Sequence, residues 1–139
     1  MADALEFWSY VSTSQLLEET LPSALNDLVT AAQLKNERLA VTGVLLFTGA
    51  HFTQYLEGAP KELRELRQAI ETDDRHRDVT TLSQGKISGR SAKQWLAYVQ
   101  PSVYLDTAVR QAMSSLKTGS SAGVHKLLAI LQEFGHLKN

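Results

Sequence analysis

Hydrophobic positions along this chain alternate with polar ones in some segments and recur at helical spacing in others. Over residues 5–12 the alternation predicts a strand with two different faces, because successive side chains of a strand point to opposite sides of its sheet. One face would hold Leu5, Phe7, Ser9 and Val11, and the other Glu6, Trp8, Tyr10 and Ser12. Neither face is purely apolar, and the second presents a phenol and a hydroxyl to whatever lies against it.

Two helical segments and four further strands are expected after this first strand. Apolar residues on one helical face predict a helix over about 22–34, ended by the polar residues 35–38. The apolar run 39–47 is typical of a strand buried on both faces, and Gly43 inside it indicates a bulge or the close approach of a backbone or ligand. A turn at 48–50 and a strand over 51–57 predict a hairpin. A helix over 61–72, a charged loop over 73–77 and strands over 79–87 and 95–99 complete this part.

The order βαββαββ predicts an α+β fold, a ferredoxin-like sandwich with both helices on one face of a mainly antiparallel sheet. Two more amphipathic patterns, over about 105–116 and 124–134, predict two C-terminal helices joined by a linker of glycine, serine and alanine. We expect these helices either to cover the open face of the sheet or to join the sheet of a partner. The expected division is therefore a core over 1–100 and a two-helix extension over 101–139.

Composition and charge narrow the function classes. The 139 residues are 43% hydrophobic and 21% charged, as in one soluble globular domain, and the formal charge of −1 makes nucleic acid and anionic membranes poor partners. The absence of cysteine excludes disulfides, thiolate metal sites, cysteine nucleophiles and photochemistry that adds a cofactor to a thiol. Four scattered histidines give no metal-ligand spacing. Without a secretory signal or a long apolar stretch, the chain is expected in the cytoplasm.

Several polar or partly polar residues lie in segments that are otherwise mainly apolar. They are Tyr10 on the first strand, Asn36 just after the first helix, Thr42 beside Gly43, Gln54 between apolar neighbours on its face, and Trp95 at the start of the last strand. Each alone is unremarkable as a core rim or a helix cap. Because buried amides need hydrogen-bond partners, the set together indicates a polar ligand held between the first helix and the sheet.

These residues resemble a known family, the BLUF domains, which are blue-light receptors that use flavin. The resemblance rests on the Tyr-x-Ser of residues 10–12, on Asn36 followed by the run 41–46, and on Phe52-x-Gln54-x-Leu56-Glu57-Gly58. Asp73-x-Arg75-His76 and Arg90 followed by Trp95 extend it, so that it covers residues 5 to 100. The long motif from Val41 through Gly58 has the spacing of the family.

The resemblance implies a non-covalently bound flavin, usually FAD with FMN or riboflavin as alternatives, whose ring lies between the two core helices. Asn36 would hold its pyrimidine edge, and Tyr10, Gln54 and Trp95 would be the photoactive residues. The remaining cofactor contacts implied by the family are Ser12, Leu28, Lys35, Phe52, Ile70, Arg75 and His76. Lys35 stands where many relatives have Asn or His, while Ala69, Ala92 and Ala97 replace larger or polar family residues.

The implied function is that of a short photoreceptor without an enzymatic domain. Light would drive electron and proton transfer from tyrosine to flavin and reverse the hydrogen bonds of the glutamine. The signal would pass to an unknown downstream protein or change the assembly, and the apolar stripes of the C-terminal helices favour a homo-oligomer.

Two other functions are compatible with the same predicted fold. A hydrolase of the acylphosphatase type would need an anion-binding loop with an arginine, and the polar stretch after Ser12 contains none. A flavin-free interaction module would be colourless after purification, whereas a flavoprotein is yellow.

Overall fold

The structure is a computed structural model that describes residues 4–137, so residues 1–3 and 138–139 of the two expected segments lie outside the described residues. The chain begins with β1 (Leu5–Ser14), the one-turn 3-10 helix η1 (Glu18–Thr20), α1 (Leu21–Leu39), β2 (Thr42–Phe47) and β3 (His51–Gly58). It continues with α2 (Pro60–Glu71), β4 (His76–Ile87), β5 (Ala97–Val99), α3 (Val103–Thr118) and α4 (Ala122–Leu137). The predicted α+β order βαββαββ followed by two helices is confirmed.

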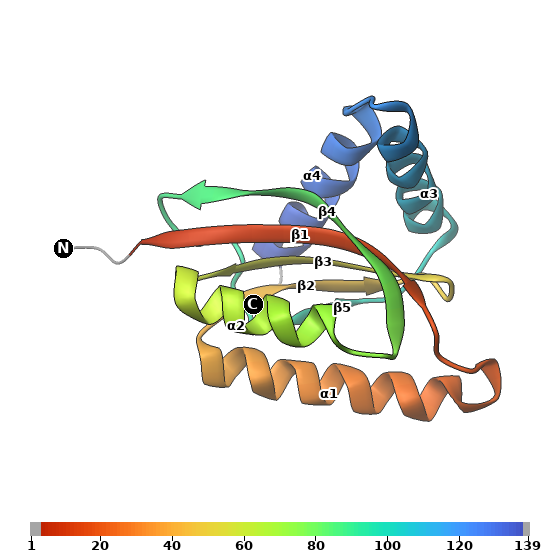
Figure 1. The fold of residues 1–139 in the computed structure, drawn as a ribbon, viewed down its shortest axis with the longest axis horizontal. Helices are drawn as coiled ribbons and strands as arrows, with labels where there is room; N and C mark the ends of the chain where they lie inside the picture. Colours follow the sequence, from red (N-terminus) through yellow and green to blue (C-terminus); the bar gives the residue numbers. More distant parts are fainter. Residues whose placement is uncertain (1–3, 138–139) are drawn as a thin grey trace.

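The strands form one sheet in the order β4-β1-β3-β2-β5. β5 runs parallel to β2, and the other neighbouring pairs are antiparallel. Helices α1 and α2 cover one face of the sheet, and α3 and α4 pack against the other (Figure 1). The molecule therefore has three layers, and each face of the sheet has its own apolar core.

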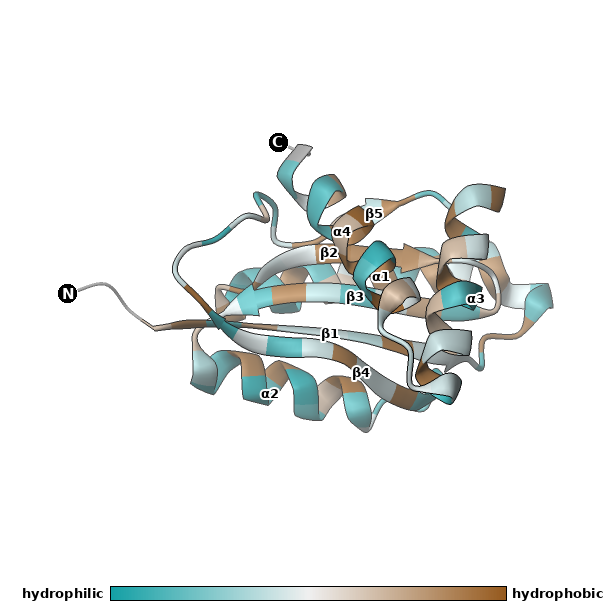
Figure 2. Ribbon diagram, turned by 90° about the horizontal axis from the view of Figure 1, so that it is seen from above, coloured by the Kyte–Doolittle hydropathy of each residue, from teal (hydrophilic) through white to brown (hydrophobic). Residues whose placement is uncertain are grey.

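The first core lies between the sheet and the pair α1 and α2. It confirms the predicted alternation of the first strand, because Trp8 and Tyr10 point into this core whereas Phe7 and Val11 point to the opposite one. Figure 2 shows hydrophilic and hydrophobic positions alternating around α2, as expected for a helix with one buried face. Tyr10 is buried in this core, which also holds apolar side chains from both helices and from β2 and β3.

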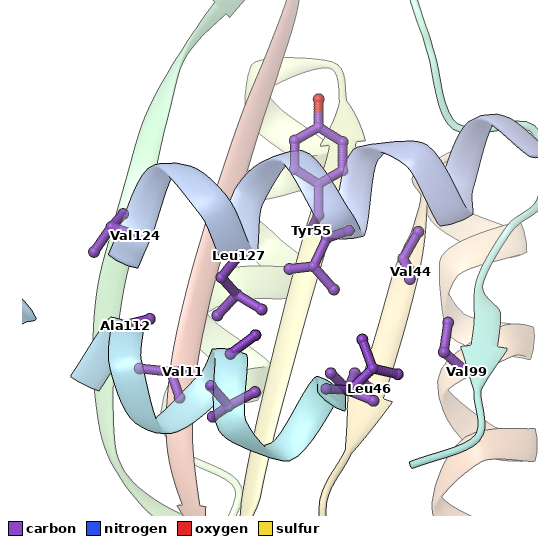
Figure 3. Close-up of a cluster of buried hydrophobic side chains, with 12 residues drawn as sticks. Val11, Val44, Leu46, Tyr55, Val99, Ala112, Val124 and Leu127 are labelled. Carbon is purple, nitrogen blue, oxygen red and sulfur yellow. The ribbon is translucent and has the colours of Figure 1, made fainter. Parts of the chain in front are cut away.

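The second core lies under the C-terminal helices. Val11, Val44, Leu46, Tyr55 and Val99 face Ala112, Val124 and Leu127 across the layer (Figure 3). The C-terminal helices thus cover the second face of their own sheet, which was one of the two arrangements expected. None of the helices within residues 4–137 is long and apolar enough to cross a membrane.

Several boundaries differ from the expectation: β1 continues to Ser14 instead of residue 12, and β2 begins at Thr42 instead of residue 39. Helix α1 continues to Leu39 because Lys35, Glu37 and Arg38 are good helix formers, and it ends where Ala40 takes a left-handed conformation with φ 55°. Asn36 therefore lies in the last turn of the helix and not after it. β4 begins at His76, inside the expected charged loop, and β5 begins at Ala97, which leaves Trp95 before the strand.

Gly43 on β2 is explained by the neighbouring backbone of β3. A Cβ atom at this position would collide with the carbonyl oxygen of Tyr55 and with the side chain of Leu56. Among the predicted explanations, the close approach of another backbone is the one observed. This contact brings β2 tightly against β3, which carries Gln54.

Candidate functional site

A cavity opens between α1, α2 and the sheet face that carries Tyr10. It holds about 720 Å³ of empty space, a figure that includes its open mouth. Its lining consists of Tyr10, Leu28, Ala31, Ala32, Lys35, Asn36, Phe52, Gln54, Leu66, Ala69, Ile70, Asp73, Arg75 and His76. The structure thus brings together most of the residues expected to contact a cofactor, but neither Ser12 nor Trp95.

Tyr10 and Gln54 form the polar centre of the inner wall. They are paired across the antiparallel strands β1 and β3, so both side chains leave the same face of the sheet. The Gln54 Nε2 atom donates a hydrogen bond of 2.6 Å to the Tyr10 hydroxyl, and the two side chains are 7% and 1% exposed. This bond uses one of the two N–H groups of the Gln54 amide and leaves the side-chain oxygen Oε1 for a further partner.

The surroundings of Tyr10 keep its phenol protonated. Burial raises the pKa of Tyr10 far above its ordinary value, the charge of Asp73 adds to the rise, and the hydrogen bond from Gln54 opposes it only in part. The residue is therefore a neutral phenol at physiological pH, with a proton and an electron that it can give.

An alkaline titration can test this shift. The pKa of tyrosine is about 10 in an unfolded chain and higher for folded Tyr10, so its contribution to stability is complete below about pH 10 and is lost above it. We expect the tyrosinate absorbance of the folded protein near pH 10 to be the same in the wild type and in Tyr10→Phe, with circular dichroism reporting the folded state. A step near pH 10 that disappears in Tyr10→Phe would contradict the structure.

Asn36 brings a second amide to the cavity from the last turn of α1. It is 1% exposed, and its Nδ2 atom donates a hydrogen bond of 2.7 Å to the main-chain carbonyl of Trp95. One turn earlier, Gln33 makes a similar bond of 3.0 Å to the carbonyl of Leu96. These bonds hold the segment before β5 to α1, and they leave the side-chain oxygen Oδ1 of Asn36, a residue that lines the cavity, for another partner.

His76 closes one side of the cavity and explains the place of Ser12. Its Nε2 atom lies 2.6 Å from the carbonyl oxygen of Ile70, and because a carbonyl only accepts, Nε2 carries a hydrogen. Its Nδ1 atom lies 2.7 Å from the hydroxyl of Ser12. Ser12 therefore contacts the cavity through the ring that it orients, although it is absent from the lining.

Charged residues line another part of the cavity. Arg75 forms an ion pair of 2.6 Å with Asp73. Although burial opposes ionisation of Asp73, the hydrogen bonds and charge of Arg75 hold its pKa below the usual value. Lys35 adds another cation. The cavity thus combines an apolar interior with side chains suited to an anionic or polar group.

Trp95 lies away from this cavity. It is 42% exposed and borders a separate groove on the far side of α1, with Leu34 and Gln33. Its main-chain carbonyl accepts a hydrogen bond from Asn36, which lines the cavity. The role of its indole beside a cofactor stays a prediction.

Some lining residues were missed from the sequence although a signal for them was present. Helix α1 contributes Leu28, Ala31, Ala32 and Lys35, and helix α2 with the following turn contributes Leu66, Ala69, Ile70 and Asp73. Both sets follow the spacing i, i+3, i+4, i+7 of one helical face. Of these, Ala31, Ala32, Leu66, Ala69 and Asp73 had not been assigned to a cofactor. The three alanines place short side chains on these two helix walls of the cavity.

This fold and cavity define a small α+β domain that can enclose a planar molecule between two helices. A family model described as "BLUF: Sensors of blue-light using FAD" matches residues 5–97. The chain therefore belongs to the BLUF family, a family of sensory domains, and the resemblance inferred from its motifs is confirmed.

Individual relatives agree with this assignment. The chain is 33% identical over 86 residues to photoactivated adenylate cyclase subunit beta of Euglena longa, which covers 62% of this chain and 10% of that protein. It is 33% identical over 69 residues to the blue light- and temperature-regulated antirepressor BluF of Escherichia coli, covering 50% of this chain and 17% of that protein. The chain thus spans only a small part of the curated relatives that it matches.

Solved structures show the same fold over nearly the whole chain. BlrB, a BLUF protein in its dark state, matches with a TM-score of 0.73 at 24% identity and covers 96% of both chains. The photo-activated state of BlsA matches with a TM-score of 0.75 at 23% identity, covering 97% of this chain and 96% of that one. These matches include the two C-terminal helices, so the three-layer arrangement occurs in other proteins.

The residues of the cavity fit the flavin that the family uses. A flavin ring is flat, with an apolar dimethylbenzene end and a polar pyrimidine edge that carries carbonyl and N–H groups. Leu28 and Ile70 would offer apolar surface to such a ring, and the buried amides of Asn36 and Gln54 would be available to its polar edge. Because an amide both donates and accepts, each can pair with either kind of group on that edge.

Proposed function

We propose that this chain is a blue-light photoreceptor in which Tyr10 and Gln54 switch hydrogen bonds around a non-covalently held flavin, with FAD the first candidate. The observation that carries the proposal is the 2.6 Å bond between Gln54 Nε2 and the Tyr10 hydroxyl inside the cavity. Light absorption makes a bound flavin a strong electron acceptor. The phenol then supplies an electron and a proton, and Gln54 lies in position to exchange its donor and acceptor atoms.

The amide of Gln54 gives the switch its two states. When Nε2 of Gln54 donates to Tyr10, the Oε1 atom of Gln54 is available only as an acceptor. Rotation or tautomerisation of the amide would instead offer a donor to a flavin carbonyl. A stronger hydrogen bond there lowers the excitation energy slightly and gives a small red shift. No bond to the protein forms, which agrees with a chain that lacks cysteine.

The test of this proposal is an absorption spectrum before and after blue illumination. We expect purified protein to be yellow, to shift its flavin band to slightly longer wavelength in light, and to return in darkness. Colourless protein that takes up neither FAD, FMN nor riboflavin would contradict the proposal, as would a bound flavin whose spectrum does not respond to light. Extraction of the pigment and its chromatography would identify the flavin.

Flavin binding should weaken when Asn36 is replaced by alanine, because the buried amide is lost from the cavity wall. One hydrogen bond is worth about 1 kcal/mol, so we expect the dissociation constant to rise roughly fivefold or more. Titration of flavin-free protein with FAD, followed by the quenching of flavin fluorescence, measures this change.

Gln33→Ala is the matched control for Asn36→Ala. It removes the neighbouring bond from α1 to the Leu96 carbonyl, but Gln33 does not line the cavity. We expect its affinity for FAD to stay near that of the wild type. Equal weakening in both variants would show that Asn36 acts by holding the segment before β5 rather than by contacting flavin.

Signal output is proposed to involve the extension over residues 101–139, whose helices α3 and α4 cover the second sheet face. A switched hydrogen bond is worth about 1 kcal/mol, so it can bias only an element that is already nearly balanced between two states. We propose that these helices pass the signal to a downstream protein or to a second copy of the chain. Size measurements in darkness and in light distinguish a change of assembly from a change within one subunit.

A further inference from the structure

A second redox-active side chain lies directly against Tyr10. Trp8 is two residues earlier on β1, so its indole leaves the same face of the sheet. The two rings are stacked with their centroids 4.8 Å apart and their planes at 28°, and Trp8 is only 2% exposed. Trp8 does not line the cavity. The order is therefore cavity, phenol, indole, with the indole one ring further away.

Arg67 of α2 places a positive charge on the same indole. Its guanidinium carbon lies 4.7 Å from the centre of the Trp8 ring. Hydrogen bonds to Gln84 and Thr81 and an ion pair with Glu71 hold the arginine in this position. A cation over an aromatic face is attracted to the electron-rich ring and opposes the loss of an electron from it.

We propose that Trp8 is a second electron donor of this photoreceptor, which competes with the switch of Gln54, and that Arg67 limits its use. The inference rests on the proposed function, in which excited flavin first takes an electron from Tyr10. Before the oxidised phenol gives up its proton, one electron passes to it from the indole of Trp8. Tyr10 is reduced to its starting state, and Trp8 becomes an indole radical cation. The electron held by the flavin later returns to Trp8, so the cycle closes without another reactant.

The surroundings of Trp8 determine what happens to its radical. The indole Nε1–H donates to the hydroxyl of Thr81 at 2.9 Å, and Arg67 donates to the same oxygen at 3.3 Å. A hydroxyl that already accepts two hydrogen bonds is a poor base, so the indole proton stays in place. The oxidised indole can therefore only recover an electron. Each use of this path restores Tyr10 before Gln54 has changed, which lowers the yield of the red-shifted state.

Variants at Trp8 and Trp95 test the donor, because these are the two tryptophans of the chain. Transient absorption of the flavin-loaded protein should show an indole radical in the wild type and in Trp95→Phe, and none in Trp8→Phe. Trp8→Phe should also raise the yield of the red-shifted state per absorbed photon. A radical that persists in Trp8→Phe, or disappears in Trp95→Phe, would overturn the proposal.

Substitutions of Arg67 test the same idea without changing the buried core. Arg67→Met should increase the indole radical and lower the yield of the red-shifted state, whereas Arg67→Lys retains a cation and should remain near the wild type. Equal radical amplitudes in Arg67→Met and the wild type would overturn the limiting role of the charge. These variants keep the test valid even if Trp8→Phe fails to fold.

A measurement without flavin tests the contact itself. In flavin-free Trp95→Phe protein all indole emission comes from Trp8, and adding Arg67→Met should shift the emission maximum while Arg67→Lys should not. An unchanged maximum would show that the cation does not act on this ring. A wild type that shows the red shift without an indole radical overturns the role of Trp8 alone, whereas absence of the red shift itself contradicts both this inference and the proposed function.

Discussion

The light-induced red shift is expected to disappear completely when Tyr10 is replaced by phenylalanine. Phenylalanine keeps a ring beside Trp8 and in the cavity wall, but it has no oxygen to accept the hydrogen bond from Gln54. It also has no acidic proton to give after an electron has left. The difference spectrum between lit and dark protein, recorded at equal flavin content, measures the effect. A normal shift in Tyr10→Phe would remove this residue from the switch.

Gln54→Leu removes the other end of the same bond and should also abolish the shift. Leucine fits the apolar company of Phe52 and Leu56 on this face of β3, so we expect the flavin to remain bound. Loss of flavin from this variant would mean that Gln54 mainly holds the cofactor. If both variants keep the flavin but lose the red shift, Tyr10 and Gln54 act together in the switch.

The faces of β1 and β3 could be predicted because the chain there follows the simple period of a strand. Alternation alone placed Trp8 and Tyr10 on one side and Phe7 and Val11 on the other, and the turn before His51 was marked by a glycine that adopts φ 98°. Because Tyr10 and Gln54 are direct partners across these strands, correct faces were enough to bring them together.

The end of α1 could not be predicted from polarity. Residues 35–38 are polar because they lie in the last turn of a helix whose outer side meets water, whereas Asn36 in the same turn is buried. The start of β4 was missed for a related reason. This strand is at the edge of the sheet, where Arg77 and Asp78 are exposed while the main chain pairs with β1.

The positions of Trp95 and Ser12 relative to the cavity could not be predicted, because they depend on contacts between residues far apart in the sequence. The motif residues of the segment before β5 are held to α1 by side-chain bonds to main-chain carbonyls, which no local pattern reveals. The same holds for Ser12, whose partner His76 follows it by more than sixty residues. Glu57 is a further case, since a carboxylate at the end of a strand is ordinarily exposed.

Glu57 is instead fully buried and ties the segment before β5 to β3. Its carboxylate accepts hydrogen bonds from the main-chain N–H groups of Ser91 and Ala92 at 3.0 and 2.9 Å and from the hydroxyls of Ser91 and Tyr55 at 2.8 and 2.7 Å. Burial and this last bond raise the pKa of Tyr55 to about 12. The glutamate thus lies three residues beyond Gln54 on the same strand and anchors the chain that leads to Trp95.

Glu57→Ala is expected to lower the free energy of unfolding by about 3 kcal/mol or more. Each buried donor that loses its acceptor costs about 1–3 kcal/mol, and Tyr55, Ser91 and Ala92 would lose theirs together. For a domain whose stability is typically about 5–15 kcal/mol, this is a large fraction. Unfolding by urea, followed by circular dichroism, gives the value, and amide hydrogen exchange should become faster at Ser91 and Ala92.

Glu71→Ala provides the matched control because it removes a carboxylate that is 44% exposed and pairs with Arg67 at 3.5 Å. Surface ion pairs contribute little, so we expect a change within about 0.5 kcal/mol. Equally small losses of unfolding free energy in Glu57→Ala and Glu71→Ala would mean that water replaces the buried acceptor without cost. A large loss confined to Glu57→Ala, together with faster exchange at Ser91 and Ala92, would establish Glu57 as the anchor between the strand of Gln54 and the chain before β5.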